Sequence, residues 1–405
     1  MIVNANSVHI PLPDNSVQCV VTSPPYWGLR KYDGAQDYKW DDGWTGGLGL
    51  EPTPEMFIDH MVQIFREVKR VLRDDGVAWV NMGDCYAQNK GTMRGDNETS
   101  AKAIHRQMLR GTSTGQHGGW EGRASRAANT AIGNLKPKDL VMMPHRLALA
   151  LQADGWWVRS DVIWAKPNPM PESVNGWRWE QCKDCTGCDK CKDNNGLVLR
   201  RGSWRPTSSH EHIFMLAKSS MYYSDGEAVR EKNTFKTKWN EPNKRHLTRS
   251  HGNSELSTKT GQGFHRVGSI TAGRNLRNVW HIPTAPYKGA HYATFPPELA
   301  RRCVLSSTSR HACSKCGMAW SRYDESYMPS CQCDAGTKPC VVLDVFAGSG
   351  TVGQVCRELP YQRDFVGLDI SYEYLHGQAL LRSERITTKA SLQELPMFAD
   401  DNGGK

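Results

Sequence analysis

The chain has 405 residues, of which 38% are hydrophobic, and its formal net charge at pH 7 is +9. This length is enough for one catalytic domain with insertions or for two domains, and the positive charge favours a polyanionic partner. No apolar run approaches the roughly 20 residues of a membrane span and no basic-then-apolar signal opens the chain, so we expect a cytoplasmic, intracellular protein without a membrane partner.

The predicted elements alternate between strands and helices along the chain. Residues 1–22 should form a short strand and then a buried strand, and residues 28–49 an ordered loop. Residues 54–72 have apolar side chains at helical spacing. The remaining predicted segments are a strand at 77–82, a helix within 139–153, strands at 156–164, 213–217, 341–344 and 365–368, and a helix at 298–305. This alternation predicts an α/β fold with a mainly parallel sheet covered on both faces.

The buried strand at 17–21 runs directly into Ser23, Pro24, Pro25 and Tyr26. Two prolines hold the chain rigid and lack backbone donors, so Ser23 Oγ and the Pro24 carbonyl would form a fixed pair of hydrogen-bond acceptors. Tyr26 adds a flat ring beside them. The pattern suits a planar substrate whose amino group points at the acceptors, although a purely structural turn is the alternative.

A second motif follows the strand at 341–344, which ends in Asp344. Glycines after a strand let the backbone approach a ligand at a helix N-terminus, and an acid ending the next strand can bind ribose hydroxyls. Phe346, Gly348, Gly350, Thr351 and Asp369 occupy these positions. Together they predict a nucleotide-like ligand.

The two motifs resemble those of the amino-group DNA methyltransferases, which methylate cytosine N4 or adenine N6 with S-adenosylmethionine. The catalytic motif comes first, as in the permuted beta group of that family. The resemblance covers most of the chain and includes residues 164–168, 210–214, 291–296 and Arg301. It implies a Rossmann-like, doubly wound sheet of seven strands.

The resemblance also implies roles for individual residues. Ser23, Pro24, Pro25 and Tyr26 would be catalytic. Phe346, Gly348, Gly350 and Thr351 would hold the methyl donor, with Asp369 on its ribose and Asp344 steadying the loop. Thr294 and Phe295 precede a helix that runs beside the donor site in relatives. Asn6 stands where relatives usually carry an aspartate near the donor's adenine, which is a departure from the family pattern.

Eight of the thirteen cysteines form two clusters. Cys313, Cys316, Cys331 and Cys333 resemble a zinc ribbon with four thiolate ligands. Cys182, Cys185, Cys188 and Cys191 are spaced three residues apart, which fits a second structural zinc site or, as the alternative, an iron–sulfur cluster. Such sites would cross-link and stabilise segments that lack a hydrophobic core of their own.

Two insertions are rich in basic residues. Residues 89–133 form a basic, polar stretch that either closes on DNA phosphates or remains a solvated loop. Residues 230–277 contain eleven Lys or Arg and three Glu, interleaved with aromatic residues. Their position matches the target-recognition region of the family, with a disordered basic linker as the alternative.

We therefore expect a site-specific DNA methyltransferase that acts on a flipped base in double-stranded DNA. Ser23 favours cytosine N4 over adenine N6. The competing hypotheses are a protein glutamine methyltransferase and an inactive, zinc-bearing DNA-binding protein. The resemblance allows for a cognate restriction endonuclease and does not specify an oligomeric state. The expected division is 1–88 (catalytic half of the core), 89–133 (basic insertion), 134–224 (core with the cysteine insertion 182–191), 225–280 (target recognition), 281–385 (donor-binding half with the zinc ribbon 313–333) and 386–405 (tail).

Overall fold

The structure is a computed structural model. It describes residues 1–28, 37–87, 135–136, 138–169, 171–172, 176–182, 194–231, 273–285, 295–324 and 326–383. The basic insertion 89–133, most of the expected recognition region 225–280 and all but the first of the cysteines at 182–191 lie outside these ranges. Within them, no helix combines the length and the apolar character needed to cross a bilayer.

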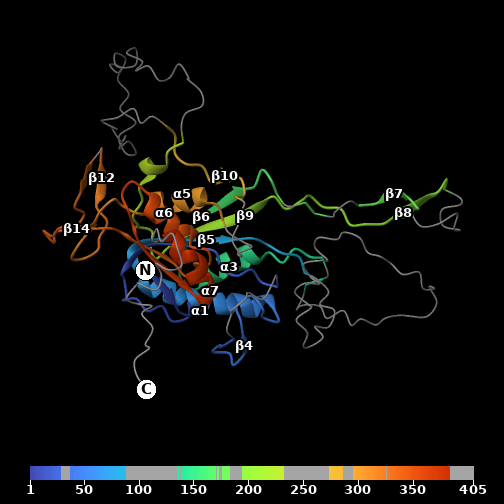
Figure 1. Ribbon diagram of the computed structural model, residues 1–405, viewed down its shortest axis with the longest axis horizontal. Coiled ribbons are helices and arrows are strands. Elements are labelled where there is room, and N and C mark those ends of the chain that lie inside the picture. The colour runs from blue at the N-terminus through green and yellow to red at the C-terminus, as the bar shows by residue number, and fades with distance from the viewer. Residues whose placement is uncertain are drawn as a thin grey trace, which may run out of the picture.

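One large sheet organises the described residues (Figure 1). Its strands in spatial order are β1 (Ile2–Asn4), β16 (Asp364–Asp369), β15 (Val341–Asp344), β2 (Val17–Thr22), β5 (Leu72–Met82), β9 (His210–Ala217), β6 (Trp157–Ala165) and β10 (Val279–His281). All neighbouring strands pair in parallel except β9, which is antiparallel to both β5 and β6. The expected mainly parallel sheet is therefore confirmed.

The expected number of seven strands is wrong, because the described residues already form a sheet of eight. The additional strand is β10, which pairs with β6 through only three residues. A strand this short carries too few positions for an alternating pattern to be detected in the sequence.

Helices cover both faces of the sheet, as a doubly wound fold requires. The helices α1 (Pro54–Val71) and α3 (Met143–Ala153) bury their apolar residues in one cluster with Val20 and Leu343. On the other face, α5 (Pro297–Ser307) and α6 (Thr351–Glu358) pack in a cluster with Val21 and Val342. Neighbouring strand residues point to opposite faces, so both sides of the central strands are buried.

The ends of α1 follow from local chemistry. Thr53 Oγ1 accepts a hydrogen bond from the Met56 N–H, and Pro54 stands at the first helical position, where its missing donor costs nothing. The helix ends at Val71 and the chain continues at once into β5. The strand thus begins five residues earlier than the predicted start at residue 77.

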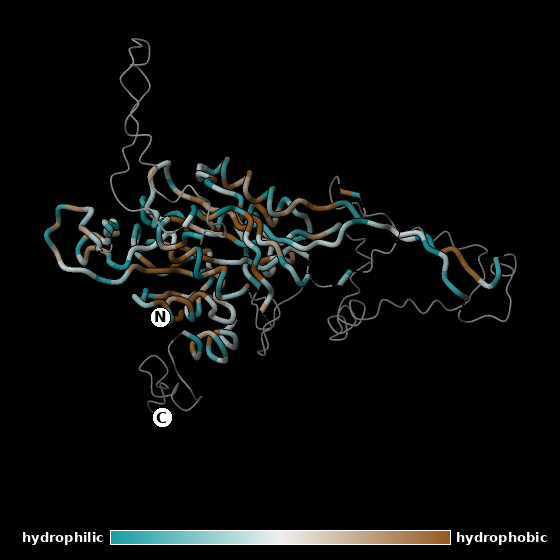
Figure 2. The backbone as a smooth tube through the Cα atoms, turned by 90° about the horizontal axis from the view of Figure 1, so that it is seen from above, coloured by the Kyte–Doolittle hydropathy of each residue, from teal (hydrophilic) through white to brown (hydrophobic). Residues whose placement is uncertain are grey.

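Smaller elements surround the sheet. The two-stranded sheets pair β3 (Tyr38–Lys39) with β4 (Thr45–Gly46), β7 (Arg178–Gln181) with β8 (Leu197–Arg200), β11 (Ala312–Cys313) with β14 (Thr337–Lys338), and β12 (Ser321–Tyr323) with β13 (Ser326–Met328). Short helical segments are η1 (Gly226–Val229), α7 (Tyr372–Tyr374), η3 (Leu375–Ala379) and α8 (Leu380–Ser383). The β7–β8 hairpin projects from one side of the body and the β12 and β14 segments from the other (Figures 1 and 2).

Candidate active site

The two predicted motifs meet at one edge of the sheet. β2, β15 and β16 are parallel and adjacent, so their carboxyl ends lie together. Ser23 follows β2, Phe346 lies two residues beyond β15, and Asp369 ends β16. Ligands of open α/β sheets bind at this kind of edge.

A side-chain hydrogen bond joins the two motifs directly. Thr22 Oγ1 lies 2.7 Å from Asp344 Oδ1, and both residues are buried. The same carboxylate oxygen accepts the Phe346 N–H at 3.1 Å. Burial raises the pKa of Asp344 from 3.8 to about 7, although these two hydrogen bonds lower it.

Tyr26 is held by a polar network that the sequence motif does not contain. Its hydroxyl donates to Glu211 Oε2 at 2.7 Å, and the Asn81 side-chain amide donates to both groups. Lys166 donates to the other oxygen of Glu211. The pKa of the Tyr26 hydroxyl is raised by burial and by the nearby Glu211 carboxylate, so Tyr26 remains a neutral donor.

The Tyr26 ring also needs a glycine beside it. A Cβ at Gly83 would lie 2.8 Å from Tyr26 Cε2, which is closer than real Cβ contacts allow. Gly83 directly follows β5, whose last residues approach the turn after β2. The ring orientation is thus set by residues at the end of β5 and by Glu211 on β9.

Trp27 has a structural role. It is 3% exposed, packs in the core cluster that contains α1, and donates from its indole N–H to the Glu51 carbonyl at 2.9 Å. In the expected loop 28–49, Gly28 N–H donates to the Gly49 carbonyl at 2.8 Å. Residues 29–36 of that loop lie outside the described ranges.

The glycine loop is shaped around tight backbone contacts. Gly350 has φ 75°, and a Cβ there would lie 2.7 Å from Ala379 Cα. The Gly348 N–H donates to Asp369 Oδ2 at 2.8 Å, and the Ser371 N–H donates to Oδ1 at 2.9 Å. Asp369 is therefore positioned by the loop itself, while burial raises the pKa of its carboxyl group.

Arg382 fixes the loop from the C-terminal side. Its guanidinium donates to the Ser349 carbonyl at 3.1 Å, to Ser349 Oγ at 2.9 Å and to Thr351 Oγ1 at 3.2 Å. Thr351 and Ser349 are both buried. Thr351 thus uses its hydroxyl inside the protein.

The other residues expected near the donor divide into three cases. Asn6 lies at the same edge, because the N–H of the preceding residue, Ala5, donates to the Asp369 carbonyl at 3.3 Å. The Oδ1 atom of Asn6 accepts a hydrogen bond from the Val8 N–H. Phe295 is 8% exposed and packs in the cluster with α5 and α6. Thr294 lies outside the described residues.

One cysteine cluster is assembled, and most of the other lies outside the described ranges. The sulfur atoms of Cys313, Cys316, Cys331 and Cys333 lie within 4.8 Å of one another. Backbone N–H groups of Cys316 and Lys315 point at the Cys313 sulfur and lower the pKa of its thiol to about 6. Cys182 ends the described part of the β7 segment, while Cys185, Cys188 and Cys191 lie outside the described ranges.

Sequence reasoning gave no role to Asn81, Lys166 or Glu211. Lys166 and Glu211 lie in stretches that carry the family resemblance, and all three are polar residues at or just beyond the ends of apolar strands. That placement is the one signal that could have identified them.

A further group of polar side chains consists of His145 on α3, Asp161 on β6 and His212 on β9. The nitrogen and oxygen atoms of these side chains that could bind a metal lie within 4.8 Å of one another.

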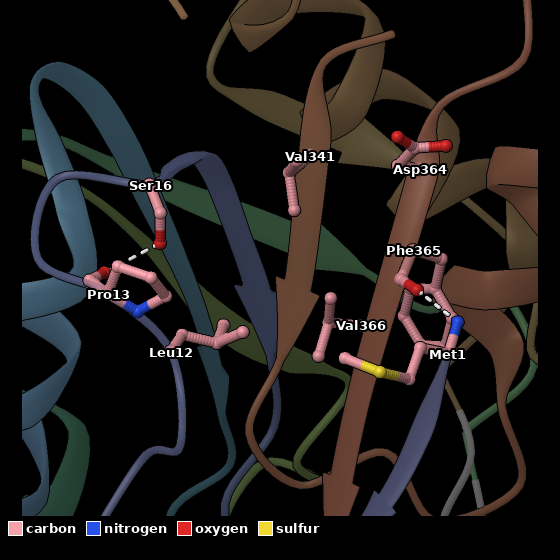
Figure 3. Close-up of a pocket in the computed structure, with 8 residues that line it drawn as sticks. All are labelled: Met1, Leu12, Pro13, Ser16, Val341, Asp364, Phe365 and Val366. Atoms are coloured by element: carbon pink, nitrogen blue, oxygen red, sulfur yellow. Dashed lines mark hydrogen bonds between the residues drawn. The ribbon is translucent and has the colours of Figure 1, made fainter.

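A pocket of about 380 Å³ lies away from this edge (Figure 3). Its walls include Met1, Val341 and Asp364, which stand at the amino ends of β1, β15 and β16. The Met1 amino group donates to the Phe365 carbonyl at 2.6 Å. The pocket is therefore separated from the Ser23 turn by the length of the strands.

Comparisons with known proteins cover both motifs. A family model described as a DNA methylase matches residues 17–380. The chain is 37% identical over 374 residues to the Type II methyltransferase M.Cfr9I of Citrobacter freundii, covering 92% of this chain and 83% of that protein. It is 36% identical over 365 residues to M.XycI of Xanthomonas campestris pv. cyanopsidis, with coverages of 90% and 80%. It is 34% identical over 369 residues to M.SmaI of Serratia marcescens, with coverages of 91% and 83%.

Proposed function

Because the chain belongs to the DNA methylase family, we propose that it transfers a methyl group from S-adenosylmethionine to the exocyclic amino group of a base in DNA, with cytosine N4 as the acceptor. The observation that carries the proposal is the hydrogen bond between Thr22 and Asp344. It connects the residue before Ser23 to the strand end before the glycine loop. The proposed acceptor and donor sites therefore follow two adjacent parallel strands, β2 and β15.

The residues of the glycine loop fit the methyl donor. The close approach of Gly350 to Ala379 leaves no room for a side chain there, and the Asp369 carboxylate is oriented by two backbone N–H groups. Phe346, Gly348, Gly350 and Thr351 would enclose the methionine part, and Asp369 would accept hydrogen bonds from the ribose. Asn6, Thr294, Phe295 and Asp344 would complete the surroundings of the donor. S-adenosylmethionine, when bound, supplies an electrophilic methyl group.

Ser23 and Pro24 activate the acceptor nitrogen. The lone pair of an exocyclic amino group is delocalised into the base, so the nitrogen is a poor nucleophile. Hydrogen bonds from its N–H groups to Ser23 Oγ and the Pro24 carbonyl favour a tetrahedral nitrogen with a localised lone pair. These fixed acceptors stabilise the positive charge that develops on nitrogen in the transition state more than they stabilise the neutral ground state. Pro25 keeps the turn rigid, and the released proton passes to water.

Tyr26 provides the wall on which the target base stacks. The base must leave the duplex to reach the turn, at a cost of a few kcal/mol that stacking offsets. Glu211 accepts a hydrogen bond from the Tyr26 hydroxyl and is itself held by Lys166 and Asn81. The ring is therefore presented in one orientation, which lowers the entropy lost when the base binds.

Ser23 supports cytosine N4 as the acceptor, because a serine at this position is more often associated with that base in the family. Adenine N6 methylation is the alternative, since the same pair of acceptors could hold either amino group. The relatives described as type II methyltransferases support a site-specific enzyme that works beside a restriction endonuclease.

We also propose a structural zinc ion at Cys313, Cys316, Cys331 and Cys333. Four sulfur atoms within 4.8 Å match a closed tetrahedral site with no open position for catalysis. A second ion at Cys182, Cys185, Cys188 and Cys191 would close the end of the β7–β8 hairpin.

We assign target recognition to residues 225–280. The other domain boundaries are those predicted from the sequence.

One experiment tests the function and the acceptor together. Purified protein is incubated with isotopically labelled S-adenosylmethionine and unmethylated genomic DNA, and the DNA is then digested for nucleoside mass spectrometry. Labelled N4-methylcytosine is the expected product, and N6-methyladenine would select the alternative. If neither methylated base rises above the background of a Ser23→Ala control, the proposal is overturned.

A further inference from the structure

The β7–β8 hairpin is an arm that the core does not need. Its strands pair from Arg178 with Arg200 to Gln181 with Leu197, and it extends well beyond the body in both views (Figures 1 and 2). No residue within 177–182 or 194–205 is buried. An isolated two-stranded hairpin is only marginally stable in water, so an extended arm of this kind suggests a binding function.

The arm leaves the body at the edge that carries the candidate active site. β6 is parallel to β2 and β5 through the intervening antiparallel β9, so the end of β6 and the start of β9 lie at the same edge as Ser23. The Lys166 N–H donates to the Ser209 carbonyl at 2.7 Å and closes the neck of the arm. The two residues that flank this neck, Lys166 and Glu211, belong to the network around Tyr26.

Three tryptophans on the arm are exposed to solvent. Trp177 is 67% exposed, Trp179 is 53% exposed and Trp204 is 73% exposed. Trp179 lies on β7, and Trp177 directly precedes the first residue of that strand, Arg178. Large apolar side chains exposed together mark an interaction surface more often than single exposed residues do.

Arginines accompany these tryptophans and determine the class of partner. Residues 176–182 and 194–205 contain Arg178, Arg200, Arg201 and Arg205 and one acid, Glu180, so they carry a net positive charge. Glu180 lies 2.6 Å from Arg178 and 3.5 Å from Arg200, and Arg205 pairs with Glu172 at 2.6 Å. The Arg201 guanidinium lies 4.9 Å from the centre of the Trp177 ring. Arginine beside exposed aromatic rings suits a polyanion that also offers flat or apolar surface, and nucleic acid has both.

We propose that the β7–β8 arm binds duplex DNA next to the target base, with its arginines on phosphates and its tryptophans against the sugars and groove edge. This inference rests on the proposed function, because it assumes a DNA substrate. The arm contributes to DNA affinity and leaves the methyl transfer to the Ser23 turn. It extends the DNA-contacting surface beyond the predicted recognition region.

The test uses two independent variants of the full-length protein. Trp177→Ala with Trp179→Ala removes the apolar contacts, and Arg200→Gln with Arg201→Gln removes two positive charges from the exposed hairpin. Tyr323→Ala, at a 66% exposed tyrosine on the opposite side of the body, is the matched control for the first pair, and Arg66→Gln is the control for the second. Binding is measured by fluorescence anisotropy with a fluorescein-labelled, unmethylated duplex of about 40 base pairs.

Each arm variant should weaken the duplex Kd about tenfold, while the controls stay within twofold. The arginine pair should also flatten the salt dependence by a slope of about 1.8, or 0.9 per lost phosphate contact. The Kd for S-adenosylmethionine and kcat at saturating DNA should not change. Thermal unfolding and light scattering of every variant report folding and oligomeric state.

Two results would overturn the inference. If both arm variants bind the duplex like the wild type, the arm does not contact DNA. If they bind it normally but change the oligomeric state, the arm docks a second copy of the chain. If the wild type methylates no DNA, the proposed function fails, and the anisotropy comparison still decides whether the arm binds DNA.

Discussion

Thr22 Oγ1 donates a 2.7 Å hydrogen bond to Asp344 Oδ1 across two adjacent parallel strands. The bond is buried, and it links residues that are 322 positions apart in the chain. Neither residue belongs to the core of a motif, yet each stands where a strand gives way to its motif. The bond therefore ties the Ser23 turn to the glycine loop, in addition to the pairing of β2 with β15.

The Asp344 carboxyl should make stability depend on pH. Its pKa is raised from 3.8 to about 7 by burial, so the folded state binds the proton more tightly than the unfolded state does. The resulting stabilisation is fully present below about pH 4 and is lost as the pH rises through 7. Asp344→Asn, which resembles the protonated form, should therefore gain in Tm relative to the wild type between pH 5 and pH 8. Asp59→Asn, at an exposed position of α1, is the control, and a Tm difference that is constant with pH would contradict the assignment.

Ser23→Ala should lower kcat by about 10²–10³-fold, the range observed when a single group that stabilises transition-state charge is removed. The Kd for S-adenosylmethionine should be unchanged, because Ser23 acts on the acceptor base. Steady-state methylation kinetics and calorimetry measure the two quantities separately. Ser16→Ala in the loop before β2 is the control, and wild-type turnover of Ser23→Ala would remove Ser23 from the mechanism.

The parts of the site that the sequence predicted are local patterns. An apolar run that stops at Ser23, Pro24 and Pro25 specifies a strand end and a rigid turn without reference to the rest of the fold. The same holds for the run before Gly348 and for Asp369 at the end of the next strand. Both motifs could therefore be located, and parallel pairing of their strands brought them to one edge.

The parts that escaped prediction depend on strand order. Tyr26 meets Glu211 although 185 residues separate them, because β9 inserts in an antiparallel sense between β5 and β6. No local pattern encodes that neighbour. Arg382 likewise reaches Ser349 from a short C-terminal segment whose packing could not be derived from spacing.

Asp369→Ala should weaken binding of S-adenosylmethionine by about 1–3 kcal/mol through the loss of charge-assisted hydrogen bonds to the ribose. Asp369→Asn should lose less, because its amide oxygen can still accept the Gly348 N–H. Calorimetry of both variants separates a role in binding from a role in shaping the loop. Equal donor affinity in Asp369→Ala and the wild type would place the ribose elsewhere.

Elemental analysis of the purified protein should give about two zinc ions per chain, one for each cluster of four cysteines. Cys316→Ser with Cys333→Ser should lose one of them and lower the Tm, since the β11–β14 segment has little core of its own. Cys356→Ser is the control for the zinc content, because that cysteine lies on α6 and is not a member of the cluster. Iron with visible absorbance would assign an iron–sulfur cluster to Cys182, Cys185, Cys188 and Cys191.

The network around Tyr26 separates stacking from orientation. Tyr26→Ala removes the wall and should raise the KM for DNA about tenfold or more, since base–aromatic stacking contributes about 1–3 kcal/mol. Tyr26→Phe keeps the ring but frees it from Glu211, so it should raise KM only a few-fold.

Glu211→Gln tests the same network from the other side. The change leaves the Lys166 ammonium without its carboxylate and should lower the free energy of unfolding by about 1–3 kcal/mol. Its effect on KM should match that of Tyr26→Phe, because both release the ring. Glu55→Gln, at an exposed position of α1 whose carboxylate pairs with Arg146, is the matched control and should leave KM and stability near the wild type. For the two Tyr26 variants, an equal rise of the KM for DNA in Tyr26→Ala and Tyr26→Phe would contradict stacking. The hydroxyl, and not the face of the ring, would then make the contact with the base.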